Sequence, residues 1–185
     1  LDMAGYGLAA VEDYGLPNCP DHIKQLEFDS NCKYFNSGFL LINLDYWRKN
    51  NLEHELVEFS QKDRIVYFHD QDALNFVFKH SWLRLPPKWN HLNIYHIRIK
   101  KMFYSREEYE EFYSNPSILH YSDKYFKPWF TTPFIPYKKI WIDYMRKSQW
   151  NNYEFKNNPR QLYTILKIIY LQAKILLYRI KFITS

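Results

Sequence analysis

Short apolar runs near the start of the chain predict buried strands. Gly7–Val11 is apolar and is followed by Glu12 and Asp13, and Phe39–Leu44 is nearly all apolar and follows an Asn-Ser-Gly sequence. Runs without alternation are typical of strands that are covered on both faces. We expect a turn at residues 36–38, where glycine lets a ligand or another backbone approach closely. This turn is therefore a candidate binding site.

Apolar residues at helical spacing follow these strands. Asp45 is placed to cap a helix that continues to about Phe59, and Asp70 opens a second amphipathic helix that ends near Lys79. The acids in the first turn of the second helix lie where the helix dipole favours negative charge. A third, short helix is expected over residues 106–113.

Two further segments predict extended chain. Trp82–Asn90 contains two consecutive prolines, and each proline biases the residue before it away from helix. Ser117–Tyr121 predicts a strand that carries His120 to a loop ending in Lys127-Pro-Trp129. Short strands that alternate with helices indicate an α/β layer architecture.

The C-terminal segment predicts a basic amphipathic helix from Asn158 to about Phe182. Asparagine followed by proline is a favourable helix start. Basic residues recur every seven positions and apolar residues occupy another side; these are Arg160, Lys167, Lys174 and Lys181, and Leu162, Ile165, Leu166, Ile169, Leu176, Leu177 and Ile180. Such a helix suits a membrane surface, although packing on its own domain would also explain the pattern.

Composition narrows the class of protein. The chain has 185 residues, 46% of them hydrophobic and 24% charged, so it can bury a sizeable core and fits one domain or a domain plus an appendage. No run of about eighteen uncharged apolar residues predicts a membrane span, and no secretory signal begins the sequence.

Cys19 and Cys32 have no metal-type spacing and are expected to be free thiols. The net charge of +5 is concentrated in the tail, without a recognised nucleic-acid module, so nucleic acid is not an expected partner.

Two groups of polar residues could carry chemistry. Asp70, Gln71 and Asp72 form the densest cluster, although helix capping alone would explain such acids. His120 lies at a strand end close to Lys127, and an imidazole beside an ammonium could bind a metal and a phosphate together. The remaining histidines are expected to be surface or packing residues.

The order of the motifs is more specific than any one of them. The chain reads, in sequence, AAVED, YFNSGFLLINLDYWR, DQDALN, LPPKWN and HYSDKYFKPW. This series resembles glycosyltransferase family 8, the retaining, nucleotide-sugar-dependent enzymes that include lipopolysaccharide galactosyl- and glucosyltransferases, from about Leu8 to Trp129. The resemblance implies an α/β fold, a partial GT-A-type (Rossmann-like) mixed sheet flanked by helices, over residues 1–150. Residues 151–185 would be a basic amphipathic helical tail.

The same resemblance implies roles for individual residues. Gln71 and Asp70 would be catalytic, and His120 would be a ligand of Mn²⁺ or Mg²⁺. Residues that would contact the UDP-sugar donor are Asp13, Asn36, Ser37, Gly38 and Lys127. Asp72 and Asn75 look structural. Gln71 is not a carboxylate nucleophile, so a front-face reaction with retention is expected, in which the leaving phosphate takes the acceptor proton.

The sequence departs from the family pattern in two ways. Asp123 stands where the family loop has a glycine after the histidine, and Lys127 lies seven residues after His120 instead of six. The nucleotide-binding half with an Asp-x-Asp metal motif would precede Leu8, so the chain is expected to be a fragment lacking that half.

Two functions follow as hypotheses. The first is transfer of a hexose to a glycan or glycolipid acceptor of the lipopolysaccharide type, in the cytoplasm and peripheral to the inner face of the cell membrane. The alternative is a non-catalytic remnant that serves as a binding or structural module.

Overall fold

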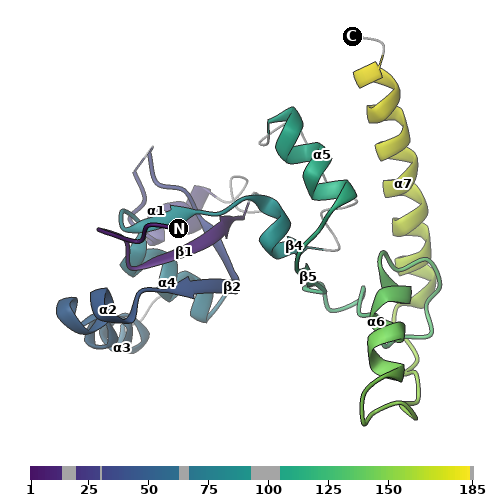
Figure 1. Ribbon diagram of the computed structural model, residues 1–185, viewed down its shortest axis with the longest axis horizontal. Coiled ribbons are helices and arrows are strands. Elements are labelled where there is room, and N and C mark those ends of the chain that lie inside the picture. Colours follow the sequence, from purple (N-terminus) through teal and green to yellow (C-terminus); the bar gives the residue numbers. More distant parts are fainter. Residues whose placement is uncertain (14–19, 30, 63–66, 93–104, 184–185) are drawn as a thin grey trace. The chain divides into compact units, whose positions relative to one another are not determined.

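The computed structural model describes residues 1–13, 20–29, 31–62, 67–92 and 105–183. The chain divides into two compact units, residues 1–90 and 91–185. Unit 1 contains β1 (Leu8–Glu12), α1 (Pro20–Gln25), β2 (Phe35–Ile42), α2 (Leu44–Asn50), α3 (Leu52–Gln61), α4 (Asp70–Phe78), β3 (Trp82–Arg84) and the 3₁₀ helix η1 (Pro87–Asn90). Unit 2 contains β4 (His91–Leu92), α5 (Arg106–Ser114), β5 (Leu119–His120), α6 (Lys138–Arg146) and α7 (Gln161–Ile183) (Figure 1).

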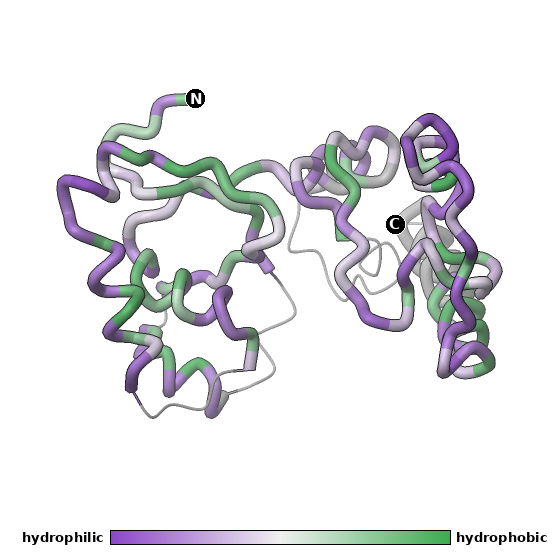
Figure 2. Tube along the Cα trace, turned by 90° about the horizontal axis from the view of Figure 1, so that it is seen from below, coloured by the Kyte–Doolittle hydropathy of each residue, from purple (hydrophilic) through white to green (hydrophobic). Residues whose placement is uncertain are grey.

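The three strands of unit 1 form one mixed sheet. Their order is β2-β1-β3, with β2 antiparallel and β3 parallel to the central β1. The paired β1 and β2 carry most of the hydrophobic positions of the sheet (Figure 2). The predicted mixed α/β architecture is confirmed.

The central strand is buried on both faces. Leu8 and Ala10 pack with Phe35, Leu52 and Phe78 on one face. Ala9 and Val11 pack with Leu85 on the other face, because successive side chains of a strand point to opposite faces of the sheet.

The close backbone approach that glycine permits occurs at Gly7. A Cβ atom at this position would overlap the ring of Phe78. The strand therefore enters the core at a point where only a residue without a side chain fits.

The Asn-Ser-Gly sequence lies inside β2 and does not form a turn in front of it. Ala10 pairs with Leu40, whereas the next residue, Val11, pairs with Asn36, so the register shifts at this point. The extra residues of β2 form a bulge, which bends the strand and redirects its side chains. The prediction that this strand is covered on both faces is wrong, because β2 lies at the edge of the described sheet and Leu41 and Ile42 are exposed.

The predicted helix after β2 is divided in two. Asn51 has a φ of 52° and ends α2 in the left-handed region, and α3 starts at the next residue. Asparagine tolerates this conformation better than most residues. The cap of α2 is Asn43, whose side chain accepts a hydrogen bond from the N–H of Tyr46, and not Asp45 as expected.

The proline-containing segment is extended only in its first part. β3 covers residues 82–84, and η1 follows at residues 87–90. A proline is tolerated in the first turn of a helix, where its missing N–H has no intrahelical acceptor, so Pro87 begins η1 without loss.

Unit 2 has its own small core. Phe126, Ile135 and Ile168 are buried together with Leu92 and Leu171. The strands β4 and β5 form a parallel pair in which Leu92 lies opposite His120. The strand predicted over residues 117–121 is confirmed for residues 119 and 120 only. The predicted third helix is confirmed as α5, which starts with a capping box between Ser105 and Glu108.

Helix α7 starts at Gln161, three residues after the expected Asn158. The Asn158 side chain is buried, where its Nδ2 donates to the carbonyl of Tyr125 and to the hydroxyls of Thr132 and Thr164. Its Oδ1 accepts from the N–H of Arg160. Asn158 thus fixes the start of the helix to the core of unit 2.

The buried face of α7 differs from the predicted one. Thr164, Ile168 and Leu171 are buried, whereas Leu162, Leu166 and Ile169 of the predicted apolar side are 71%, 58% and 53% exposed. The helix therefore packs on its own unit and still presents apolar side chains to solvent. In the described part of the chain, no helix is both long and apolar enough to cross a membrane.

Candidate functional site

Three segments of unit 1 meet at one carboxylate oxygen. Oδ2 of Asp13, directly after β1, accepts a hydrogen bond from Nδ2 of Asn36 at 3.0 Å and one from Nε2 of Gln71 at 3.3 Å. Asn36 lies on the bulge of β2, and Gln71 lies in the first turn of α4. The end of β1, the bulge of β2 and the start of α4 are thus brought together.

The two amide groups are oriented by these bonds. Because both NH₂ groups donate to Asp13, both amide oxygens face other donors. Oδ1 of Asn36 accepts from the N–H of Gly38 at 2.9 Å and from Nδ2 of Asn90 at 2.8 Å. Asn36 is 8% exposed and Gln71 is 7% exposed, so their bonds are shielded from water.

Asn90 is a member of the cluster that the sequence reasoning missed. It lies in η1 and is buried. The signal that could have identified it is its position at the end of the LPPKWN motif, which belongs to the series of motifs that carries the family resemblance.

Ser37 links the bulge to the start of α4. Its N–H donates to Oε1 of Gln71 at 2.9 Å, and its hydroxyl donates to Oδ2 of Asp70 at 3.1 Å. Asp70 is exposed, so its carboxylate can accept hydrogen bonds from hydroxyl groups of a ligand. The cluster thus offers one exposed carboxylate beside two buried amides.

Asp72 and Asn75 have structural roles on the buried face of α4, as the sequence predicts. Both amide atoms of Asn75 bond to the backbone of Phe35, with Oδ1 accepting from its N–H and Nδ2 donating to its carbonyl. Asp72 accepts from His22 and from the hydroxyl of Tyr34. Burial and the bond to Asp72 raise the pKa of the Tyr34 hydroxyl far above its ordinary value. This network fixes α4 against β2, and with it the position of Gln71.

His22 and His91 are not surface residues. Both are buried, with His22 Nε2 placed 2.8 Å from Oδ1 of Asp72 and His91 Nδ1 placed 2.8 Å from the carbonyl of Phe112. They are packing residues with polar partners.

The other group of predicted site residues lies in unit 2. His120 ends β5 and is partly buried. Nζ of Lys127 donates to the carbonyls of Tyr121 and Ser122, at 2.5 and 3.2 Å, and lies over the ring of Trp129. Burial lowers the pKa of the Lys127 ammonium. The lysine is therefore folded back over the residues that follow His120, where it orders their loop.

Asp123 shapes this loop in place of the family's glycine. Its Oδ1 accepts from the N–H of Tyr125 at 2.8 Å, and its carbonyl accepts from the N–H of Phe126. The side chain forms a turn with its own backbone, which is a common role of aspartate in loops. Asp123 therefore stabilises the turn that precedes Lys127.

His120 can supply one ligand to a divalent ion. Over the described residues, the single group of three or more ligand-type side chains that lie close together does not include His120. Among the described residues, His120 could therefore fill one coordination position of a divalent ion, and the remaining positions would need other ligands.

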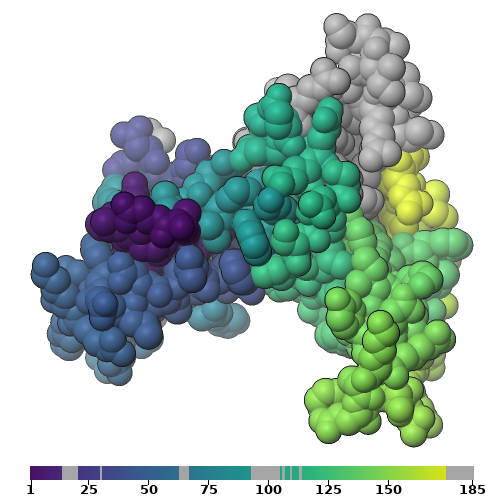
Figure 3. Space-filling model, viewed as in Figure 1, coloured from purple at the N-terminus to yellow at the C-terminus, as the bar shows by residue number. Residues whose placement is uncertain are grey.

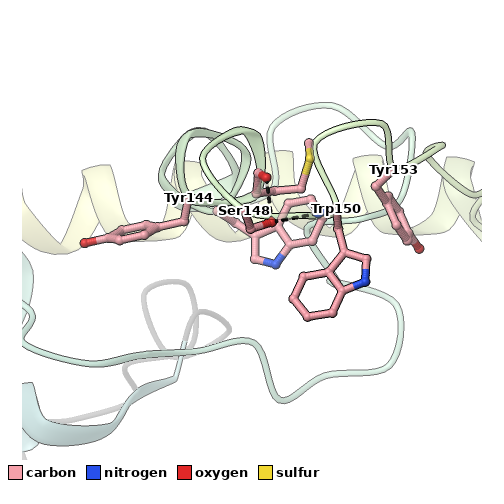
Figure 4. Close-up of a pocket in the computed structure, with 6 residues that line it drawn as sticks. Tyr144, Ser148, Trp150 and Tyr153 are labelled. Carbon is pink, nitrogen blue, oxygen red and sulfur yellow. Dashed lines mark hydrogen bonds between the residues drawn. The ribbon is translucent and has the colours of Figure 1, made fainter.

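Unit 2 also carries an aromatic pocket. It has a volume of about 450 Å³ and is lined by Trp141, Tyr144, Met145, Ser148, Trp150 and Tyr153. The Ser148 hydroxyl donates to the carbonyl of Met145 and accepts from the N–H of Trp150, which holds the residues after α6 in place (Figure 4). The segment after α6, light green in Figure 3, projects from the rest of the unit, and Tyr144 and Trp150 are largely exposed.

Known proteins resemble this chain over most of its length. General stress protein A of Bacillus subtilis (strain 168) is 33% identical over 156 residues, which are 82% of this chain and 53% of that protein. Lipopolysaccharide 1,2-glucosyltransferase of Escherichia coli is 29% identical over 131 residues, 69% of this chain and 38% of that enzyme. The chain thus spans about half or less of the length of these curated relatives.

Two solved structures share the fold. The galactosyltransferase LgtC, crystallised with donor and acceptor sugar analogues, superposes with a TM-score of 0.65 at 21% identity and covers 80% of this chain and 54% of its own. The bifunctional glycosyltransferase WbbM gives a TM-score of 0.69 at 20% identity, over 82% of this chain and 30% of its own. Both likenesses agree with the expected partial GT-A-type arrangement. The sequence model of glycosyl transferase family 8 matches residues 1–132, and the chain therefore belongs to this family.

Proposed function

We propose that this chain forms the sugar-binding part of a glycosyltransferase that moves a hexose from a UDP-sugar donor to a glycan acceptor with retention. The observation that carries the proposal is the convergence of Asn36 and Gln71 on Oδ2 of Asp13. These residues match the family motif for the donor sugar, and they come from separate segments that a purely local capping role would not bring together.

Asp70 and Gln71 of this cluster would have different roles toward the transferred sugar. Asp70 is exposed and accepts from Ser37 through one oxygen, so its carboxylate would bind hydroxyl groups of the transferred sugar. Gln71 is held at both ends of its amide, by Asp13 and by Ser37. A fixed amide oxygen near the anomeric carbon would stabilise the positive charge that develops in an oxocarbenium-like transition state.

Gln71 is better suited to stabilise charge than to act as a nucleophile. It is a neutral amide, which is a weaker nucleophile than a carboxylate, and its Oε1 already accepts a 2.9 Å hydrogen bond from the N–H of Ser37. A front-face reaction, in which the leaving phosphate takes the proton of the acceptor hydroxyl, does not need a nucleophile from the protein. The chain would then act mainly by orientation and charge stabilisation.

Lys127 and His120 would serve the donor diphosphate. Lys127 would contact the phosphates once its bonds to the carbonyls of Tyr121 and Ser122 are exchanged for the stronger charged acceptor. His120 would supply one ligand to Mn²⁺ or Mg²⁺, and such an ion stabilises a leaving diphosphate as a Lewis acid.

The acceptor is proposed to be a glycan or glycolipid of the lipopolysaccharide type, at the inner face of the cell membrane. The acceptor class is supported by the similarity to lipopolysaccharide 1,2-glucosyltransferase. The membrane surface is supported by the exposed apolar side of α7, at Leu162, Leu166 and Ile169, together with the lysines that recur along this helix. A helix with these two features binds anionic lipid surfaces by apolar insertion and electrostatic attraction.

The test is an assay of UDP release and sugar transfer by the natural protein that carries this chain. Gln71→Ala should lower kcat by roughly a hundredfold if the amide stabilises the transition state. Gln61→Ala is the matched control, because Gln61 is an exposed amide at the end of α3 and should leave activity unchanged. Equal activity of Gln71→Ala and the parent would refute the proposal, and donor binding without any turnover would support the alternative of a non-catalytic binding module.

A further inference from the structure

Three side chains that bind transition metals meet on unit 1, and none of them belongs to the cluster around Asp13. Sγ of Cys32 lies 4.0 Å from Nδ1 of His80, and Oδ2 of Asp29 lies 3.9 Å from Nε2 of the same ring. One ligand atom from each residue can be chosen so that all three lie within 4.8 Å of one another. Asp29 and Cys32 precede β2, whereas His80 follows α4, so the group joins two separate segments.

The first segment is held by its own hydrogen bonds. Oδ1 of Asp29 accepts from the N–H of Asn31 at 2.7 Å and from the N–H of Cys32 at 3.0 Å. These bonds lower the pKa of the Asp29 carboxyl, the bond from Asn31 contributing most. The charged carboxylate thus keeps one oxygen on the backbone and directs the other toward His80.

The second segment is fixed to the sheet and to the first. The N–H of Ser81 donates to the carbonyl of Phe78, and the carbonyl of Ser81 accepts from the N–H of Gly7. Nζ of Lys79 donates to the carbonyl of Glu27 at 3.4 Å, which links the end of α4 to the segment that precedes Asp29. The backbone therefore holds His80 opposite Asp29 and Cys32 before any ion is bound.

We propose that Asp29, Cys32 and His80 form a binding site for a divalent transition-metal ion, with Zn²⁺ as the best match and water as the remaining ligand. One sulfur, one imidazole nitrogen and one carboxylate oxygen are ligand types that zinc accepts, whereas Mg²⁺ and Ca²⁺ prefer oxygen alone. Zinc bond lengths place neighbouring ligand atoms roughly 3.5 Å apart. The three ligand atoms, which lie within 4.8 Å of one another, would therefore move closer together when the ion binds.

The side chains have room for this contraction. The side chains of His80 and Asp29 are 63% and 56% exposed, so the ring can turn to direct one nitrogen at the ion without displacing the core. Cys32 is partly buried and supplies the fixed end of the site. Binding would cross-link the segment before β2 to the segment after α4 and would stabilise both.

A thiol, an imidazole and a carboxylate in this order also suggest a nucleophilic cysteine. In such an arrangement the carboxylate would hold the imidazole by a hydrogen bond, so that the ring could take the proton of the thiol. The separation of 3.9 Å between His80 and Asp29 is too long for a hydrogen bond that would orient the ring. The metal site is therefore the better interpretation.

The experiment uses metal-free protein titrated with Co²⁺, followed by competition with Zn²⁺. Thiolate ligation should give a near-ultraviolet charge-transfer band that saturates at one Co²⁺ per chain and is abolished by Zn²⁺ but not by Mg²⁺. Cys32→Ser should remove the band, and His80→Ala should weaken Co²⁺ binding by roughly tenfold or more.

Matched variants separate this site from other thiols, other histidines and the proposed ion at His120. Cys19→Ser, His54→Ala and His120→Ala should each keep the band, since none of them changes a ligand of the proposed site. Zn²⁺ should raise the Tm of the parent and not that of Cys32→Ser. A band that persists in Cys32→Ser, or the absence of any thiolate band in the parent, would overturn the proposal.

Discussion

The hydroxyl of Tyr34 donates a 2.6 Å hydrogen bond to Oδ1 of Asp72, and this bond joins the start of β2 to the buried face of α4. The same oxygen lies 2.8 Å from Nε2 of His22, and Oδ2 accepts from the N–H groups of Tyr67 and Phe68. Asp72 thus gathers four donors in the core. Gln71, its neighbour in sequence, donates to Asp13 and belongs to the candidate site.

We expect Asp72→Ala to destabilise the protein strongly. Removal of the carboxylate would leave buried donors without an acceptor, at a cost of about 3–5 kcal/mol in the free energy of unfolding. Chemical denaturation followed by circular dichroism would measure it. Asp45→Ala, which changes an exposed aspartate on α2, should leave the free energy unchanged. Similar unfolding midpoints for the two variants would show that the Asp72 network contributes little.

The Tyr34 hydroxyl should make stability depend on pH at alkaline values. The pKa of Tyr34 is raised in the folded state, so its contribution is complete below the unfolded value of about 10 and declines as pH rises above it. Tyr34→Phe should cost about 1–2 kcal/mol at pH 7, because Asp72 loses one donor.

This difference between Tyr34→Phe and the parent should become smaller between about pH 10 and 11, since only the parent can ionise at this position when unfolded. Denaturation of both proteins from pH 7 to 11 would test this expectation. A constant difference over that range would contradict it, because titrations shared by the two proteins cancel.

Lys127 should affect donor binding more than stability. Its ammonium bonds to loop carbonyls in this structure, and a diphosphate would be a stronger acceptor. Lys127→Met should raise the KM for the UDP-sugar by roughly tenfold, which corresponds to one charged hydrogen bond. Steady-state assays of the natural protein would measure this change. Lys124→Met, three residues earlier in the same loop, is the control, and an equal rise in both variants would argue against a specific phosphate contact.

The exposed apolar side of α7 should bind lipid. Replacement of Leu162, Leu166 and Ile169 by serine removes apolar surface without changing charge or the buried residues Ile168 and Leu171. We expect the triple variant to co-sediment with anionic vesicles far less than the parent. Val57→Ser, which changes an exposed apolar residue on α3, should sediment like the parent. Equal sedimentation of all three proteins would leave packing on unit 2 as the role of this helix.

The pattern of the sequence by itself determined the local elements and the family. The apolar run at residues 7–11 became β1, the segment opened by Asp70 became α4, and the basic C-terminal pattern became α7. These features depend on side-chain periodicity and on residues that start or stop a helix, which act over a few positions. The ordered motifs likewise carried the resemblance to glycosyltransferase family 8.

Only the tertiary structure decided how these elements use their side chains. The bulge in β2 depends on its pairing with β1, and the buried face of α7 depends on the shape of the core formed by Phe126 and Ile135. The bond from Asn90 to Asn36 spans 54 positions, and the bond from Gln71 to Asp13 spans 58. Contacts at such separations are selected by packing and by the need to pair buried polar groups. Neither of these produces a periodic pattern of residues that can be recognised along the chain.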